Sequence, residues 1–166
     1  MLDLIFRSES PQLEKEAQEY IDIWSQQGEN ILGVLEKVSG LEFKQKKIEV
    51  LVYEGPSSSG GPEIPMKLRA SYSKEVKMGT LVHELGHRLL ESLSSRPEGL
   101  DEHQTLNLFL YDSWFELFGK NFADMMVGVE SERKGIYDYK KAWDWFLSLS
   151  KDDGSSLRIK LSDKNK

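Results

Sequence analysis

The sequence predicts an α+β fold that is mainly helical, with a small mixed β-sheet packed on a central helix. Apolar residues recur at the helical period of about 3.6 over most of the chain, whereas period-two alternation is confined to its first half. The chain has 166 residues, of which 39% are hydrophobic. Such a chain is large enough to bury one core, so a single domain over residues 1–166 is expected.

Three short segments predict the strands. Residues 2–6, "LDLIF", and residues 47–55, "KIEVLVYEG", are rich in strand-forming side chains, and apolar and polar residues alternate over 66–72. Between the first two, Ser10 and Pro11 indicate a helix start, and the helical spacing that follows predicts one long helix or two consecutive ones ending near Gly40. Residues 56–62, "PSSSGGP", predict a mobile loop.

The second half of the chain predicts helices only. Their expected ranges are 76–95, 101–118, 121–133 and 137–150. At helical spacing, Tyr139, Trp143 and Phe146 are expected to be core contacts. The stretch "KDDG" at residues 151–154 predicts a tight bend, and the tail "SDKNK" is expected to fray.

Composition excludes several classes of function. The formal net charge of −6 argues against a nucleic-acid or anionic-membrane surface. No stretch is apolar for long enough to span a bilayer, and the N-terminus lacks the pattern of a cleaved signal, so a soluble cytoplasmic protein is expected. Because the chain has no cysteine, a transition-metal site must be built from His, Asp and Glu.

Such a site is predicted by "HELGH" at residues 83–87. On a helix, His83 and His87 lie about 40° apart, nearly opposite the leucine-rich face, so both imidazoles can reach one ion. Glu84 lies beside them, where a carboxylate can act as general base towards water activated by zinc. Gly86 leaves room for another backbone or a ligand to approach closely.

A catalytic zinc site needs a third protein ligand, and "DEHQTLNLFLYD" offers two candidates. His103 points along the apolar stripe of the next helix, whereas Glu102 projects about 100° away, near the edge of that stripe. The phase favours His103, with Glu102 as the alternative. Tyr72 and Tyr111 are candidate donors to an oxyanion, but the pattern favours neither over ordinary packing.

In these segments the chain resembles the HExxH zinc metallopeptidases of the zincin group, in a compact, gluzincin-like form. The resemblance covers residues 65–118, about a third of the chain, with "IPMKLRASYS", "HELGH" and "DEHQTLNLFLYD" in the expected order. It implies a zincin-like fold, a zinc ion held by His83 and His87, and Glu84 as the general base. It also implies a peptide or protein substrate that pairs with an edge strand of the sheet. By analogy with gluzincins, the third ligand would be Glu102.

Two other functions remain open. A binding or regulatory domain on the same scaffold would keep the metal without catalysis, although the presence of Glu84 disfavours it. A metal-free helical interaction protein would require the histidine pattern to be coincidental. Oligomeric state, substrate preference and regulation do not follow from the sequence.

Overall fold

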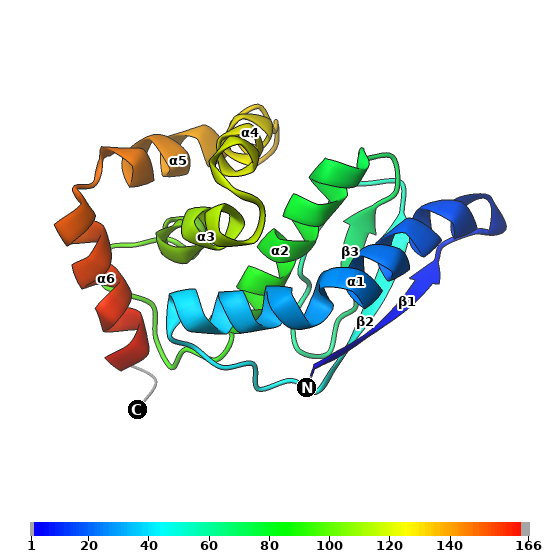
Figure 1. The fold of residues 1–166 in the computed structure, drawn as a ribbon, viewed down its shortest axis with the longest axis horizontal. Coiled ribbons are helices and arrows are strands. Elements are labelled where there is room, and N and C mark those ends of the chain that lie inside the picture. Colours follow the sequence, from blue (N-terminus) through cyan, green and yellow to red (C-terminus); the bar gives the residue numbers. More distant parts are fainter. Residues whose placement is uncertain (1, 164–166) are drawn as a thin grey trace.

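A computed structural model describes residues 2–163 of the chain, with side chains described as far as residue 161. The strands are β1 (Asp3–Ser8), β2 (Lys47–Tyr53) and β3 (Met66–Arg69). The helices are α1 (Glu14–Ser39), α2 (Lys74–Leu90), α3 (Glu102–Phe118), α4 (Lys120–Ser131), α5 (Tyr139–Ser148) and α6 (Lys151–Asp163), and a short 3-10 turn (Pro11–Leu13) precedes α1 (Figure 1). The predicted α+β class is confirmed. None of the described helices is long and apolar enough to cross a lipid bilayer.

The sheet has the order β1-β2-β3, and both strand pairs are parallel. The mixed sheet expected from the sequence is therefore wrong. The cause is the connectivity: α1 carries the chain from the end of β1 back to the start of β2, as a crossover between parallel strands must. Residues 54–65 then return the chain in the same way to the start of β3. The two helices of the first half, α1 and α2, contact β1 and β3 respectively.

The outer edge of β3 is covered by the chain itself. Residues 56–60, here called the edge segment, lie along it: Ser58 N donates to Lys67 O at 2.9 Å, and Lys67 N donates to Ser58 O at 2.8 Å. Arg69 N donates to Ser57 Oγ at 3.0 Å. The segment predicted as a loop thus occupies the strand edge that the resemblance reserves for a peptide. The predicted strand also ends early, at Arg69, where a turn at residues 70–71 leads to Ser73, the cap of α2.

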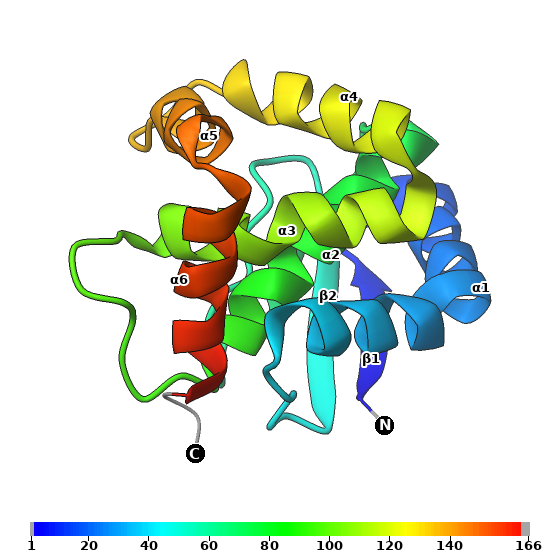
Figure 2. The ribbon, with the colours of Figure 1, turned by 60° about the vertical axis from the view of Figure 1, so that its left-hand side comes forward.

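The helices form two layers on one side of the sheet. Figures 1 and 2 show α1 and α2 next to the sheet and α3 packed on both of them, with α4 to α6 around α3, so that α2 lies between the sheet and α3. For this reason α2 is buried around its whole circumference from Gly79 to Leu90, including its histidine face. Gly86 permits α3 to approach closely, because a Cβ there would lie 2.5 Å from Leu106 Cδ1 of α3.

The C-terminal region differs from the sequence prediction in one element. Residues 151–154, expected to form a tight bend, are the first turn of α6. Ser150 caps this helix by accepting a hydrogen bond from Asp153 N at 3.1 Å. Acidic side chains in a first turn stabilise a helix as readily as they favour a bend. Of the tail expected to fray, residues 164–166 lie outside the described residues.

Candidate metal centre

The three histidines of the chain meet at one point between α2 and α3. Nε2 of His83 lies 3.0 Å from Nε2 of His87. His103, from the first turn of α3, completes a set whose ligand atoms all lie within 4.8 Å of one another. His83 and His87 are 1% and 8% exposed. These three residues can therefore hold a metal ion, and the structure brings His103 rather than Glu102 to the pair in "HELGH".

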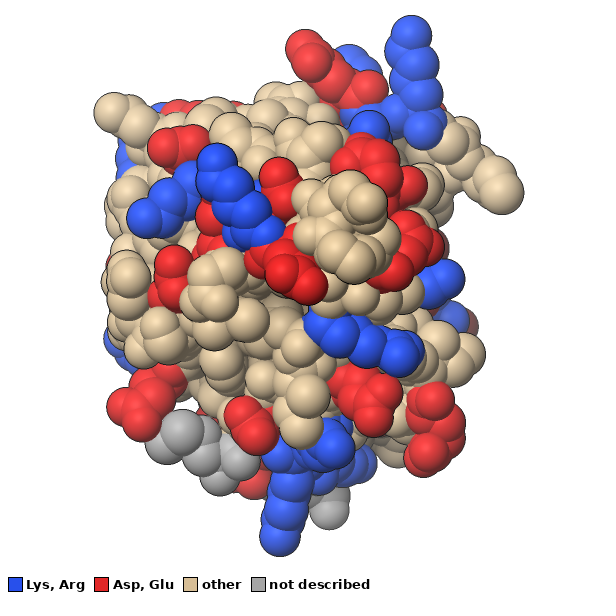
Figure 3. All heavy atoms as spheres, turned by 90° about the vertical axis from the view of Figure 1, so that its right-hand side faces the viewer, with Lys and Arg blue, Asp and Glu red and all other residues tan. Residues whose placement is uncertain are grey.

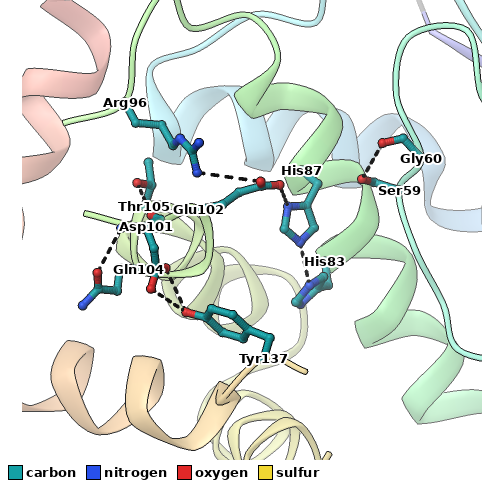
Figure 4. A network of polar contacts seen from close by, with 10 residues as sticks. All are labelled: Ser59, Gly60, His83, His87, Arg96, Asp101, Glu102, Gln104, Thr105 and Tyr137. Carbon is teal, nitrogen blue, oxygen red and sulfur yellow. Dashed lines mark hydrogen bonds and ion pairs between the residues drawn. The ribbon is translucent and has the colours of Figure 1, made fainter. Parts of the chain in front are cut away.

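Glu102 lies on the far side of His87, as Figure 4 shows. Its Oε1 is 2.6 Å from His87 Nδ1, and its Oε2 is 3.8 Å from Arg96 Nη1. Its side chain is 51% exposed, as expected for a residue at the edge of the apolar stripe. Glu102 therefore orients an imidazole and is not itself part of the histidine cluster.

The sequence analysis did not find a second carboxylate with the same role. Glu130, near the end of α4, is fully buried, and its Oε1 lies 2.6 Å from His83 Nδ1. Its other oxygen accepts a hydrogen bond from Trp143 Nε1 at 3.0 Å. No local pattern relates residue 130 to residue 83, because only tertiary packing of α4 against α2 brings the two together.

Burial and charge set the protonation of the cluster. Burial lowers the pKa of His103 to about 3, and the nearby His87 and His83 act in the same direction. Burial also acts to lower the pKa of His87, but the hydrogen bond to Glu102 and the charge of Glu84 raise it overall. The hydrogen bond from His87 lowers the pKa of Glu102 to about 2. The cluster therefore contains a neutral His103 beside a His87 that favours a positive charge.

Aromatic rings close the cluster on the side of the segment between α4 and α5. The Tyr137 ring stacks on His103 with centroids 4.1 Å apart, and Tyr139 lies edge-on to His103 at 4.7 Å. Tyr139 was expected to be a core contact. This prediction is wrong, because its ring packs against His83 and His103 and not in the hydrophobic core. Tyr111 has a different role, because its hydroxyl donates to Asp124 Oδ1 at 2.8 Å.

A groove leads away from these tyrosines. It has a volume of about 540 Å³ and lies between the start of the edge segment, the end of β3 with Tyr72 after it, and residues 133–139. Tyr72 lines this groove, as do Tyr137 and Tyr139. Glu84 is 3% exposed, and its negative charge acts on Arg133 and Tyr139 as well as on His87. The predicted general base, Glu84, is therefore buried next to His83 in the chain and within electrostatic range of His87 and of the groove residues Arg133 and Tyr139.

The donor set suits zinc chemically. Three imidazoles with one open position are an established catalytic zinc arrangement. Two nitrogens bound to one tetrahedral zinc ion at about 2.0–2.1 Å lie about 3.3 Å apart, close to the 3.0 Å between His83 and His87. Comparison of the chain with protein-family models, curated proteins and solved structures finds no match.

Proposed function

We propose that this protein is a zinc-dependent peptidase in which His83, His87 and His103 hold the metal and Glu84 is the general base. One observation carries the proposal: two buried imidazoles direct their Nε2 atoms at each other while separate carboxylates hold both Nδ1 atoms. The proposal rests on this site and not on the overall fold. The zincin-like fold was expected to have a mixed sheet, whereas the sheet here is parallel throughout.

The physical argument concerns tautomers. A carboxylate beside Nδ1 favours a proton on that nitrogen, which leaves the lone pair on Nε2. With Glu130 at His83 and Glu102 at His87, both Nε2 lone pairs are directed into the same small space. Without a metal, a proton on one Nε2 can bridge the 3.0 Å between them as an N–H···N hydrogen bond, in keeping with the raised pKa of His87; a shared cation would take the place of that proton. Imidazole ligands suit zinc and some other transition metals, and zinc catalyses hydrolysis without redox chemistry.

The residues around the cluster would share the chemistry of peptide hydrolysis. Zinc would supply a Lewis acid that acidifies water and polarises the scissile carbonyl. Glu84 would accept a proton from the attacking water and deliver it to the leaving amine, while the hydroxyl joins the acyl carbon. Tyr139, whose ring contacts His103, and Arg133, which lies over that ring, join Tyr72 on the groove side as candidates for stabilising an oxyanion. Tyr137 and Tyr111, in contrast, already donate their hydroxyls to Asp101 and Asp124.

The groove beside the histidines would take the substrate in an extended conformation. Ser58 already uses its backbone groups on β3, so a peptide cannot pair with that edge while the segment is in place. In an antiparallel pair, backbone groups of successive residues point alternately towards and away from the partner strand, so the residues on either side of Ser58 direct theirs away from β3. Ser57, which lines the groove, would therefore offer its backbone groups to a peptide there.

Zinc content and hydrolysis together test the proposal. Protein purified without affinity-tag metal or chelator should contain about one zinc ion per chain. It should cleave some members of a quenched-fluorescent peptide library, and Glu84→Gln should keep the zinc while its rate falls by at least 10²-fold. A chain that binds no zinc when the metal is supplied would refute the proposal. Zinc binding with no cleavage in any library would instead indicate the non-catalytic domain.

A further inference from the structure

The groove beside the histidine cluster is basic although the chain as a whole is acidic. Arg69, Arg133 and Lys134 line it, and none of its lining residues is Asp or Glu. Arg69 lies on one wall, after the edge segment, and the other two lie on the opposite wall between α4 and α5. The formal net charge of the chain is −6, so a groove with only cations among its charged side chains departs from the average surface.

The two cations of the α4–α5 wall have hydrogen-bonding capacity to spare. Arg133 is 17% exposed; its Nη2 donates to Thr80 Oγ1 at 3.3 Å, its Nη1 lies 3.7 Å from its nearest carboxylate, Glu130, and its Nε has no hydrogen-bond partner. Glu130 is already bound by His83 and Trp143. Among the described residues Lys134 makes no ion pair, whereas Arg69 is bound to Glu54 at 3.0 Å. A buried guanidinium with unused donors suits a carboxylate ligand, because it can bind both oxygens.

We infer that this groove recognises a carboxylate of the substrate through Arg133 and Lys134, so that the preferred peptides carry an acidic side chain or a free C-terminus next to the cleaved bond. This inference rests on the proposed function and adds the class of substrate. Its position follows from the ring contacts: Arg133 lies 5.7 Å from the centre of the Tyr139 ring, and Tyr139 contacts His103. The carboxylate therefore binds within about one or two residues of the metal.

Binding to a catalytically silent protein tests this inference. The probes are fluorescein-labelled, alanine-rich octapeptides with Glu or Gln at one internal position, each with a C-terminal carboxylate or amide. Zinc-loaded Glu84→Gln protein should bind one carboxylate form at least about tenfold more tightly than its neutral partner. Lys134→Gln and Arg133→Gln should each remove most of that preference, whereas Lys140→Gln, an exposed lysine of α5, should keep it. Comparing Glu with the C-terminal carboxylate identifies the source of the charge.

The outcomes separate this inference from the proposed function. Zinc content is measured for every variant, so a loss of the metal is not mistaken for a loss of recognition. If zinc is bound but neutral and acidic peptides bind equally, or if no peptide binds, carboxylate recognition is refuted while the metal centre stands. A preference that survives both Lys134→Gln and Arg133→Gln would also refute it. Failure of the wild type to bind zinc would refute the proposed function itself.

A second and independent inference concerns the other edge of the sheet. Asp3 N donates to Lys46 O, and Glu9 N donates to Val52 O, so the odd-numbered residues of β1 bond towards β2. The backbone groups of Leu4, Phe6 and Ser8 therefore point to the open edge. No hydrogen bond to these outward groups is found within residues 2–163.

The side chains of this edge are complementary to themselves. Ile5 is 43% exposed, with Asp3 and Arg7 two residues before and after it on the same exposed face. Within residues 2–161 neither Asp3 nor Arg7 makes an ion pair. In an antiparallel pair centred on Ile5, Ile5 lies opposite its own copy and each Asp3 lies opposite the Arg7 of the other chain. Leu4 and Phe6 then exchange the backbone hydrogen bonds.

We propose that β1 pairs with β1 of a second copy of this chain, which joins the two sheets into one of six strands. Figure 3 shows the side of the molecule on which β1 lies, where acidic and basic side chains are interspersed. A surface of mixed sign does not repel its own copy, as a surface of one sign would. Pairing would also satisfy backbone groups that otherwise make an open edge prone to disordered association.

Charge reversal across the pair tests the dimer. Sedimentation equilibrium over a concentration series should show dimers of the wild type. Arg7→Asp places like charges opposite each other twice and should weaken the dimer at least about tenfold. The double variant Asp3→Arg/Arg7→Asp should restore it, and Lys151→Asp, on α6, should have no effect. A wild type that is monomeric at every concentration, or an Arg7→Asp variant that dimerises normally, would refute the proposal.

Discussion

Glu102 binds His87 and not the centre of the histidine cluster, although it adjoins His103 in the sequence. Its Oε1 lies 2.6 Å from His87 Nδ1, on the side of the ring opposite to the Nε2 that faces His83. One helical turn therefore presents a candidate metal ligand and an orienting carboxylate side by side. Residues 102 and 103 then differ in what their loss should do to the metal.

For this reason, His103→Ala and Glu102→Gln should have different effects on zinc. Removing His103 deletes one of three ligands, so the variant should retain much less than one zinc ion per chain after dialysis. Glu102→Gln should still bind one zinc ion when saturated, with an affinity about 10- to 100-fold lower because the orientation of His87 is weakened. Elemental analysis and competition with a chromophoric chelator measure the two quantities. The reverse pattern would identify Glu102 as the third ligand.

Glu130 should matter to zinc through His83. Glu130→Gln preserves shape but replaces the charged acceptor 2.6 Å from His83 Nδ1, so zinc affinity should fall by about 10- to 100-fold. Trp143→Phe is the matched control, because it removes the hydrogen bond to the other oxygen of Glu130 without touching His83. This control should lower the free energy of unfolding by about 2–4 kcal/mol, because it leaves a buried carboxylate oxygen unpaired and opens a cavity, while zinc affinity falls less than in Glu130→Gln. Equal zinc affinities in the two variants would contradict the role assigned to Glu130.

Local patterns in the sequence were enough for part of this site. His83 and His87 are one helical turn apart, and the apolar stripe of the following helix correctly directed His103 inward and Glu102 to the edge. Their meeting could be predicted because two consecutive helices of known phase carry them.

Other parts depend on packing between distant segments. Glu130 and Tyr139 reach the histidines only because α4 and α5 fold back over α3, and no periodicity in residues 120–148 encodes that return. The parallel sheet was missed for a related reason. Alternation shows which face of a strand is buried, but the direction of its neighbour depends on where the connection runs.

Gly86 should be required for both stability and metal binding. A Cβ at this position would lie 2.5 Å from Leu106 Cδ1, and Leu106 is fully buried with little room to move. Gly86→Ala should therefore lower the free energy of unfolding by about 1–3 kcal/mol, despite the better helix propensity of alanine. Because Leu106 lies one turn after His103, the displacement of α3 should also weaken zinc binding.

A glycine on another helix serves as the control for Gly86. Gly33, on α1, has no atom within 4 Å of the position of a Cβ, so Gly33→Ala should stabilise the protein by about 0.5–1 kcal/mol. Urea unfolding with and without zinc measures both variants. If Gly86→Ala is as stable as the wild type, the close contact between α2 and α3 is not a constraint.

Lys77 and Glu19 should make stability depend on acidic pH. The Lys77 side chain is 1% exposed and its Nζ lies 2.6 Å from Glu19 Oε2, and this hydrogen bond lowers the pKa of Glu19 below its ordinary value. A carboxyl group whose pKa is lower in the folded state stabilises the fold above its unfolded pKa of about 4.3. That contribution is lost as the pH falls through the lower folded value. Because Glu19 is 41% exposed, solvent screening limits the expected contribution to about 1 kcal/mol.

Glu19→Gln should therefore be less stable than the wild type at pH 7, and the difference should shrink towards pH 3. Urea unfolding at the two pH values measures it. Lys77→Met is the informative companion, because it replaces the buried ammonium by an apolar chain of similar length and leaves only the half-exposed Glu19 without a partner. Its stability should change less between the two pH values than that of the wild type. A Glu19→Gln variant that loses as much stability in acid as the wild type would show that the pair does not govern the acid response.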